Sequence, residues 1–413
     1  MDEERLTIVS ADCHAGAARM ADYRPYVEAS RLADFDDYVA RVEAYEVERA
    51  VDPRAYGGAK ARPGEDGLWD IDAREAYLDA DGISAEVIYG QGSVPFGPYP
   101  AVAGAVRKLD YVASPALSAA GCHIYNRWLA DFCSKDPNRH LGVAKISIDD
   151  IDAAVAEVEW AARAGLKGGV HLPALVGDHI LMYNDPAYEP LWAACAANEM
   201  VINLHGGANM IYGEGAERTA LVLTEVDWLS RRALWFLIFS GVFERYPTLH
   251  LALTEQRTHW VAPMLRELDS VSDWKGNRAL RAERMPRLPS EYFKSNCFVG
   301  ASFFSRLECE AREETGVDKI MWGSDYPHQE GTWPWSGESL RWTFGCGVSS
   351  DELRAMLGGN AARCYRLDLA DLQPTAERIG PRESDLRKPI TAEELPLGQE
   401  VVSWAFRQAG AWH

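Results

Sequence analysis

The 413-residue sequence has no uninterrupted run of about 18 apolar residues, which is the length that a membrane-spanning helix requires. Its first ten residues, MDEERLTIVS, carry acidic side chains where a secretion signal has a basic segment followed by an apolar one. These two absences predict a soluble, cytoplasmic protein without a membrane partner.

Basic residues are scarce relative to acidic ones: 42 Lys and Arg stand against 62 Asp and Glu, giving a formal net charge of -20. Nucleic-acid binding needs a basic surface to neutralise phosphates, so this class of partner is excluded. The eight cysteines are scattered without a CxxC pair, which indicates neither a disulfide framework nor a thiolate zinc site. We interpret them as reduced core residues.

Short runs rich in apolar and β-branched residues alternate with segments of helical periodicity. The eight runs are residues 6–12, 83–90, 141–148, 168–173, 200–206, 249–255, 297–302 and 319–325. Parallel strands need such crossover segments, so the series predicts an α/β fold, specifically a (β/α)8 TIM barrel. An open doubly wound sheet alternates in the same way, but no GxGxxG motif follows the first run.

Two segments fall outside the alternation. Residues 15–80 are too long for a simple connection between the first two strands, and we expect them to form a cap over the barrel mouth. Residues 367–413 are rich in Pro, Gly and mixed charge. They predict a C-terminal extension that packs on the barrel or on a partner subunit, which leaves residues 1–366 as the barrel domain.

Acidic and imidazole side chains gather at the predicted carboxyl ends of the strands, which meet at one mouth in a parallel barrel. Asp12 and His14 are two residues apart on an extended chain and therefore face the same side. His205 and Asp325 stand at the same height on two other strands. A single such pair is commonly a turn aspartate beside a core histidine, but the full set predicts a metal site.

Three further residues are candidate metal ligands: His171, Glu255 and His259. They bring the total to seven potential ligands, enough for two ions, because one tetrahedral zinc takes three or four. The alternative is that His171 is a hydrogen-bonded barrel residue and that His259 is a solvated residue on the first turn of a helix. Glu255 and His259 are four residues apart, a spacing that also suits a simple surface pair.

The segment after the last predicted strand is unusual because Asp325 is followed by Tyr326-Pro327-His328. A strand that ends on Asp325 places its carboxylate at the mouth, and the Tyr-Pro turn aims His328 toward the same place. We expect Asp325, Glu255 and His328 to be catalytic, with His328 contacting either the substrate or a ligand residue.

Five motifs together resemble the amidohydrolase-2 family, whose members are metal-dependent TIM-barrel hydrolases and decarboxylases. They are DCH at 12–14, INLHGG at 202–207, SGVFERYPTLHLALTE at 240–255, MWGSDYPH at 321–328 and GGNAARCYRLD at 358–368. By position, the resemblance implies that Asp12 and His14 are the ligand pair of strand 1. It likewise implies that His205 is the ligand of strand 5 and that Asp325 binds metal or moves a proton.

The ligand set bears on the reaction. A divalent ion, whether Zn, Mn or Fe, lowers the pKa of bound water to about 7 and polarises a carbonyl, which supports hydrolysis. The resemblance implies decarboxylation as an equal possibility. The alternative is a non-haem diiron monooxygenase on the same barrel, acting in natural-product biosynthesis such as that of terpenoids. Mixed Asp, Glu and His ligands without Cys suit two Fe ions, and His171 and His259 depart from the family pattern.

Large aromatic residues cluster near the expected mouth, among them Trp69, Trp260, Trp322 and Trp333. They favour a small-molecule substrate that is hydrophobic or aromatic and carries a polar head. The resemblance also implies a homodimer, since relatives are frequently dimers.

Overall fold

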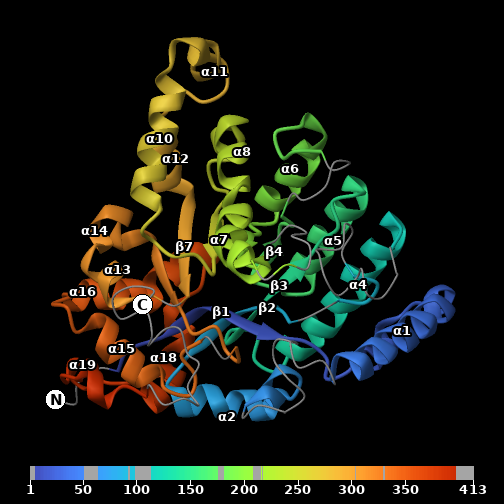
Figure 1. Cartoon of the computed structure of the whole chain (residues 1–413), viewed down its shortest axis with the longest axis horizontal. Helices are drawn as coiled ribbons and strands as arrows, with labels where there is room; N and C mark the ends of the chain where they lie inside the picture. Colours follow the sequence, from blue (N-terminus) through green and yellow to red (C-terminus); the bar gives the residue numbers. More distant parts are fainter. Residues whose placement is uncertain are drawn as a thin grey trace.

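The computed structural model describes residues 5–50, 64–91, 94–97, 113–174, 181–207, 215, 217–302, 304–328 and 331–396. Its centre is one sheet of eight parallel strands in the order β1 to β8. The backbone N–H of His14 donates to Tyr326 O at 2.7 Å and that of Asp325 donates to Asp12 O at 2.9 Å. These bonds bring β8 back to β1, so the sheet nearly closes into the predicted (β/α)8 barrel (Figure 1).

Each predicted strand overlaps an observed one. The strands are β1 (Val9–Ala15), β2 (Ala85–Gly90), β3 (His140–Lys145), β4 (Gly169–His171), β5 (Ile202–His205), β6 (Leu251–Thr254), β7 (Cys297–Ser302) and β8 (Ile320–Gly323). The largest difference is in β1, which begins later than predicted and continues past the polar residues that were expected to end it.

An irregularity in β1 explains this difference. Ser10 pairs with Glu86 and Cys13 pairs with Ile88, so β1 advances by three residues where β2 advances by two. A bulge of this kind shifts the alternation of side chains along a strand. Ala11 therefore packs in the barrel interior, and after the bulge Asp12 and His14 face the mouth.

Helices surround the strands, with α4 to α8 on one side of the barrel in Figure 1 and α13 to α19 on the other. They are α1 (Leu32–Ala50), α2 (Ile71–Asp81), α4 (Pro115–Cys133), α5 (Ile151–Arg163), α6 (Glu189–Ala197), α7 (Arg218–Arg231), α8 (Ala233–Phe239), α9 (Val242–Arg245), α10 (Val261–Asp273), α11 (Arg278–Glu283), α12 (Pro289–Asn296), α13 (Arg306–Glu310), α14 (Arg312–Thr315), α15 (Ser336–Phe344), α16 (Ser350–Arg354), α17 (Asn360–Tyr365), α18 (Leu369–Ile379) and α19 (Glu383–Leu386). Within the described ranges, no helix combines the length and the apolar character that a membrane crossing requires.

Helix α5 illustrates how the sequence forms these elements. The Asp150 side chain accepts a hydrogen bond from the Ala153 N–H at 3.0 Å and so caps the first turn. Such a cap stabilises a helix by about 1 kcal/mol. Ala154, Val158 and Ala161 are spaced at helical period and are buried against the barrel.

Side chains alternate between two cores along the strands. Val87, Val143 and Met321 belong to the cluster that fills the barrel interior. The residues that follow two of them, Ile88 and Ala144, pack outward against the helices. Outside the bulge of β1, the alternation identifies which strand-end residues point into the mouth.

The predicted cap segment contains the 3-10 turns η1 (Met20–Tyr26), η2 (Ala29–Arg31) and η3 (Glu65–Leu68), and the helices α1 and α2. Its part near Gly64 packs against the turn after β8, because the Tyr326 hydroxyl donates to Gly64 O at 2.6 Å. Residues 51–63 of the predicted cap and 397–413 of the predicted extension lie outside the described residues.

Candidate metal centre

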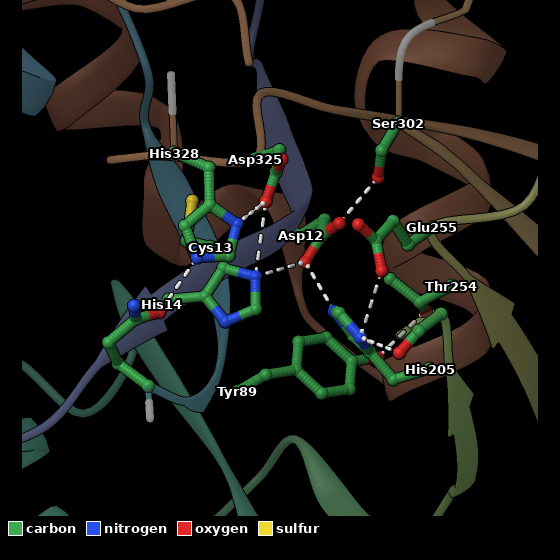
Figure 2. Close-up of polar contacts among 12 residues, drawn as sticks. Asp12, Cys13, His14, Tyr89, His205, Thr254, Glu255, Ser302, Asp325 and His328 are labelled. Carbon is green, nitrogen blue, oxygen red and sulfur yellow. Dashed lines mark hydrogen bonds and ion pairs between the residues drawn. The ribbon is translucent and has the colours of Figure 1, made fainter. Parts of the chain in front are cut away.

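Three ligand-type side chains from β1 and β5 meet at the mouth. Nε2 of His205 lies 3.1 Å from Oδ1 of Asp12, and Nε2 of His14 lies 3.5 Å from the same oxygen. Asp12 is fully buried and His14 is only 4% exposed. The donor atoms of these residues all lie within 4.8 Å of one another, a separation that one metal ion can span (Figure 2).

A second group shares His14 and comes from the segment after β8. Oδ1 of Asp325 lies 3.1 Å from Nε2 of His14 and 2.8 Å from Nδ1 of His328. The His328 ring stacks on the His14 ring with centroids 4.0 Å apart, and its Nε2 lies 2.8 Å from Oε1 of Gln91. The structure thus brings together Asp12, His14, His205 and Asp325, and it places His328 beside them, where the Tyr-Pro turn was expected to aim it.

The residues at the centre fit a cation. Among the described residues, the two ring nitrogens of His14 and the two carboxylate oxygens of Asp325 make no hydrogen bond although all four atoms are buried; the contacts of Nε2 and Oδ1 are ion-pair distances only. A buried polar atom without a partner costs about 1–3 kcal/mol, so four together need a compensating group. Imidazole nitrogen and carboxylate oxygen are ligands that zinc, manganese and iron accept, so a divalent ion would satisfy them.

Three neighbours hold the ligands in place. Ser302, at the end of β7, donates its hydroxyl hydrogen to Oδ2 of Asp12 at 2.5 Å. Oε2 of Glu255 lies 3.3 Å from Nδ1 of His205, and Gly206 O lies 3.0 Å from the same nitrogen. A proton held at Nδ1 leaves the Nε2 lone pair of His205 facing Asp12, as a metal ligand requires.

The charges at this site are strongly coupled. Burial lowers the pKa of His205, but the Asp12 carboxylate and its hydrogen bond raise it to about 9. Burial raises the pKa of Glu255 to about 8. Both shifts arise because acidic groups are concentrated in a space with little water, which is the setting that a bound cation stabilises.

Backbone geometry is strained where two acidic residues enter the site. Glu255 has φ 54° and Asp325 has φ 55°, a left-handed conformation that costs non-glycine residues energy and is common at functional sites. Glycines leave room for two of the acidic residues. A Cβ on Gly206 would lie 2.2 Å from Oε2 of Glu255, and one on Gly323 would lie 2.9 Å from Cβ of Asp12.

The other predicted ligands take different places. The half-buried His171 is adjacent to the cluster, with its ring centroid 6.2 Å from that of His205, but it belongs to neither group of converging donor atoms. Glu255 is also outside both groups and supports His205 instead. His259 is exposed, and the charged groups that affect its pKa, such as Asp227 and Glu308, are not part of the cluster.

One aromatic residue is not where the sequence predicted. Trp322 is only 2% exposed and packs between the barrel wall and the helices, not at the mouth. The reason is strand alternation, since its neighbour Met321 fills the barrel interior. Trp69 is 40% exposed, whereas Trp333 packs against Tyr326 with ring centroids 5.4 Å apart.

Several residues that support the ligands were not predicted from the sequence. Ser302 ends a predicted strand as the ligands do, so its position was a usable signal. Arg74 of α2 was not foreseeable: it donates to His14 O at 2.7 Å and forms a fully buried ion pair with Glu86 at 2.6 Å. The Tyr89 hydroxyl lies 2.7 Å from Oγ1 of Thr254 beneath the cluster.

Known proteins resemble this chain over most of its length. The sequence profile of the family described as Amidohydrolase matches residues 11–367. The γ-resorcylate decarboxylase of Rhodococcus jostii (strain RHA1) is 24% identical over 267 residues, which cover 59% of this chain and 75% of that protein.

Two solved structures share the fold. That of 5-carboxyvanillate decarboxylase from Sphingomonas paucimobilis aligns with a TM-score of 0.61 and 20% identity, covering 88% of this chain and 100% of that one. That of dihydroxybenzoic acid decarboxylase from Polaromonas sp. JS666, with bound manganese and the inhibitor 2-nitroresorcinol, gives a TM-score of 0.59 and 16% identity over 89% and 99% of the two chains.

These relatives agree with the expectation of a hydrolase or carboxy-lyase, and one of them was solved with bound manganese, but they give no support to iron or to monooxygenation. Because the profile covers more than half of the sequence, the chain belongs to the amidohydrolase family, whose motifs its strand ends carry.

Proposed function

We propose that this protein is a carboxy-lyase that removes CO2 from a small aromatic carboxylate. The observation that carries the proposal is the contact between Asp325 and His328, an acid–base pair 2.8 Å apart beside the metal-ligand cluster. Decarboxylation of an aryl acid requires a proton for the ring carbon that loses CO2, and a paired carboxylate and imidazole can supply it.

The metal would be held by Asp12, His14, His205 and Asp325. A divalent ion bound there supplies a Lewis acid that attracts the oxygen atoms of a carboxylate substrate and orients it. Ser302 fixes the Asp12 carboxylate, and Glu255 with Gly206 O fixes the His205 ring. These contacts keep the ligands in position before a substrate arrives, which lowers the reorganisation that binding requires.

The chain's own residues then handle the proton. The His328 ring is held between Gln91 at Nε2 and Asp325 at Nδ1, and it stacks on His14. In this position it can pass a proton to Asp325, which delivers it to the ring carbon. The C–C bond to the carboxylate breaks, CO2 leaves, and the electron pair of that bond becomes the new C–H bond.

Relatives support decarboxylation over hydrolysis. The enzymes from Rhodococcus jostii, Sphingomonas paucimobilis and Polaromonas sp. JS666 are decarboxylases by name, and the last was crystallised with manganese. We therefore propose manganese or zinc as the ion. A diiron monooxygenase is a second candidate function, because two groups of ligand-type side chains overlap at His14 and could hold two ions. The metal content of the protein distinguishes it from the carboxy-lyase.

The experiment is an assay of manganese-loaded protein against a panel of hydroxybenzoates, including 2,6-dihydroxybenzoate and 5-carboxyvanillate, with release of CO2 as the readout. We expect turnover of at least one of them, its loss in a chelator, and its loss in Asp325→Asn. Hydrolysis of an ester, amide or lactone without CO2 release from any aryl acid would contradict the proposal.

A further inference from the structure

Lys145 is the last residue of β3, and strand alternation points its side chain into the barrel mouth. Leu141 and Val143 of the same strand fill the barrel interior, whereas Ala144 packs outward against the helices. Lys145 follows Val143 by two positions and therefore faces the same way. In register it pairs with His171 of β4.

The backbone at this position is fixed by a helix outside the barrel. Asn126 of α4 accepts a hydrogen bond from the Lys145 N–H at 2.8 Å and donates one to Lys145 O at 2.8 Å. Asn126 also donates to Glu157 of α5 at 2.8 Å. These three bonds tie the end of β3 to two helices, so the direction in which the lysine side chain leaves the strand is set.

The side chain then extends over the end of the neighbouring strand, β2. A Cβ on Gly90, the last residue of β2, would lie 2.3 Å from Cε and 3.2 Å from Nζ of Lys145. Nζ lies 6.0 Å from the centre of the buried Tyr125 ring. A side chain at position 90 would displace the end of the Lys145 side chain from this path.

Among the described residues, no ion pair joins this ammonium group to a carboxylate. The other cations of the region are paired: Arg74 with Glu86 at 2.6 Å, and Arg257 with Asp227 at 3.9 Å. Burial lowers the pKa of Lys145, and burial followed by the charge of Lys145 lowers the pKa of the half-buried His171. A half-buried cation without a counter-ion is costly unless a ligand supplies one.

The charge of the site explains why a substrate would need this lysine. Asp12, Glu255 and Asp325 bring three carboxyl groups to the mouth, so acidic side chains outnumber basic ones there. An aromatic carboxylate arriving there adds another negative charge. Lys145 stands two strands from His205, roughly 10 Å along the rim at about 4.8 Å per strand, so its long side chain can reach a small ring held at the metal.

We propose that Lys145 is a substrate-binding residue that pairs with an anionic oxygen, carboxylate or phenolate, of the aromatic acid. The proposal rests on the proposed function for the class of substrate. The protein would then select its substrate by negative charge and not by the aromatic ring alone. A charge-assisted hydrogen bond at a poorly solvated site discriminates against a neutral analogue.

Calorimetric titration of manganese-loaded protein with 2,6-dihydroxybenzoate and with neutral resorcinol tests this directly. We expect Lys145→Met to raise the Kd of the acid at least about tenfold and to leave that of resorcinol unchanged, while Lys145→Arg stays within a few fold of the wild type. Lys167→Met is the matched control, because Lys167 is exposed and precedes β4 at the opposite end of the barrel.

Equal loss of both ligands in Lys145→Met, no loss, or a wild type that does not bind the acid would each overturn the proposal. The CO2 assay separates it from the proposed function. If binding of the acid depends on Lys145 but no CO2 is released, the role of Lys145 in binding is supported and the carboxy-lyase function is refuted. If Lys145→Met binds the acid normally and releases CO2, the carboxy-lyase function is supported and the role of Lys145 is refuted.

Discussion

The hydroxyl of Ser302 donates to Oδ2 of Asp12 at 2.5 Å, leaving Oδ1 of the same carboxylate toward His205 and His14. One residue from β7 thus fixes which oxygen of the β1 ligand faces the cluster. Such outer contacts commonly contribute 10–100-fold to metal affinity.

Ser302→Ala should therefore weaken manganese binding by about 10–100-fold without unfolding the barrel. The measurement is competition for manganese against a chelator of known affinity, with circular dichroism as the check on folding. Ser350→Ala, at an exposed serine of α16, is the control and should bind as the wild type does. Equal affinity in Ser302→Ala would show that the hydroxyl does not support the ligand.

Metal content should depend on His205 and not on His171. We expect His205→Ala to lose the bound ion, because its Nε2 lies 3.1 Å from Asp12. His171→Asn should keep it, because that ring lies outside both groups of donor atoms. Elemental analysis of the two variants beside the exposed control His259→Gln decides this. Loss of about half of the metal in His171→Asn would instead indicate a two-ion site.

The buried pair Arg74–Glu86 should be a major determinant of stability. Removing one partner leaves a buried charge, so we expect Glu86→Gln to lower the free energy of unfolding by about 3–5 kcal/mol. The double variant Arg74→Met/Glu86→Leu should recover much of that loss. Because Arg74 also holds His14 O at 2.7 Å, the double variant should still bind metal less tightly than the wild type. Urea denaturation and metal competition measure the two effects.

Asp81, at the end of α2, predicts a pH dependence of stability. Burial raises the pKa of its carboxyl to about 7, even though Ser336 N–H donates to it at 3.2 Å. The folded protein thus holds this proton more tightly than the unfolded chain, whose Asp pKa is about 3.9, so the group costs stability as pH rises from about 4 to 7. Asp81→Asn should raise Tm at pH 8 and leave it nearly unchanged at pH 4. The opposite trend would contradict the raised pKa.

Strand positions were predictable from the sequence because eight apolar runs alternate with helical segments, and that pattern has few folded solutions. The same pattern placed Asp12, His14, His205 and Asp325 at one end of the barrel, since parallel strands end at one mouth, but the direction in which Asp12 and His14 face depends on the bulge in β1. The role of Glu255 was not predictable from residue spacing. Gly206 leaves the space in which the Glu255 side chain reaches His205, so Glu255 contacts a metal ligand, whereas the sequence predicted that it would itself be one.

Other features depend on contacts between residues far apart in the sequence. The bulge in β1 moves Asp12 and His14 to the mouth without any marker in the residues themselves. Lys145 and Ser302 end their strands as the ligands do, but their side chains are not metal ligands of the expected kind. Lys145 and Ser302 are therefore not recognised when only acidic and imidazole residues at strand ends are considered.

The central claim is that Asp12, His14, His205 and Asp325 hold one divalent ion. Elemental analysis of the wild-type protein purified without chelator, beside His205→Ala, tests it most directly. We predict about one manganese or zinc ion per wild-type chain and almost none in the variant. A wild-type chain with no metal, or one with two iron ions, would contradict this account.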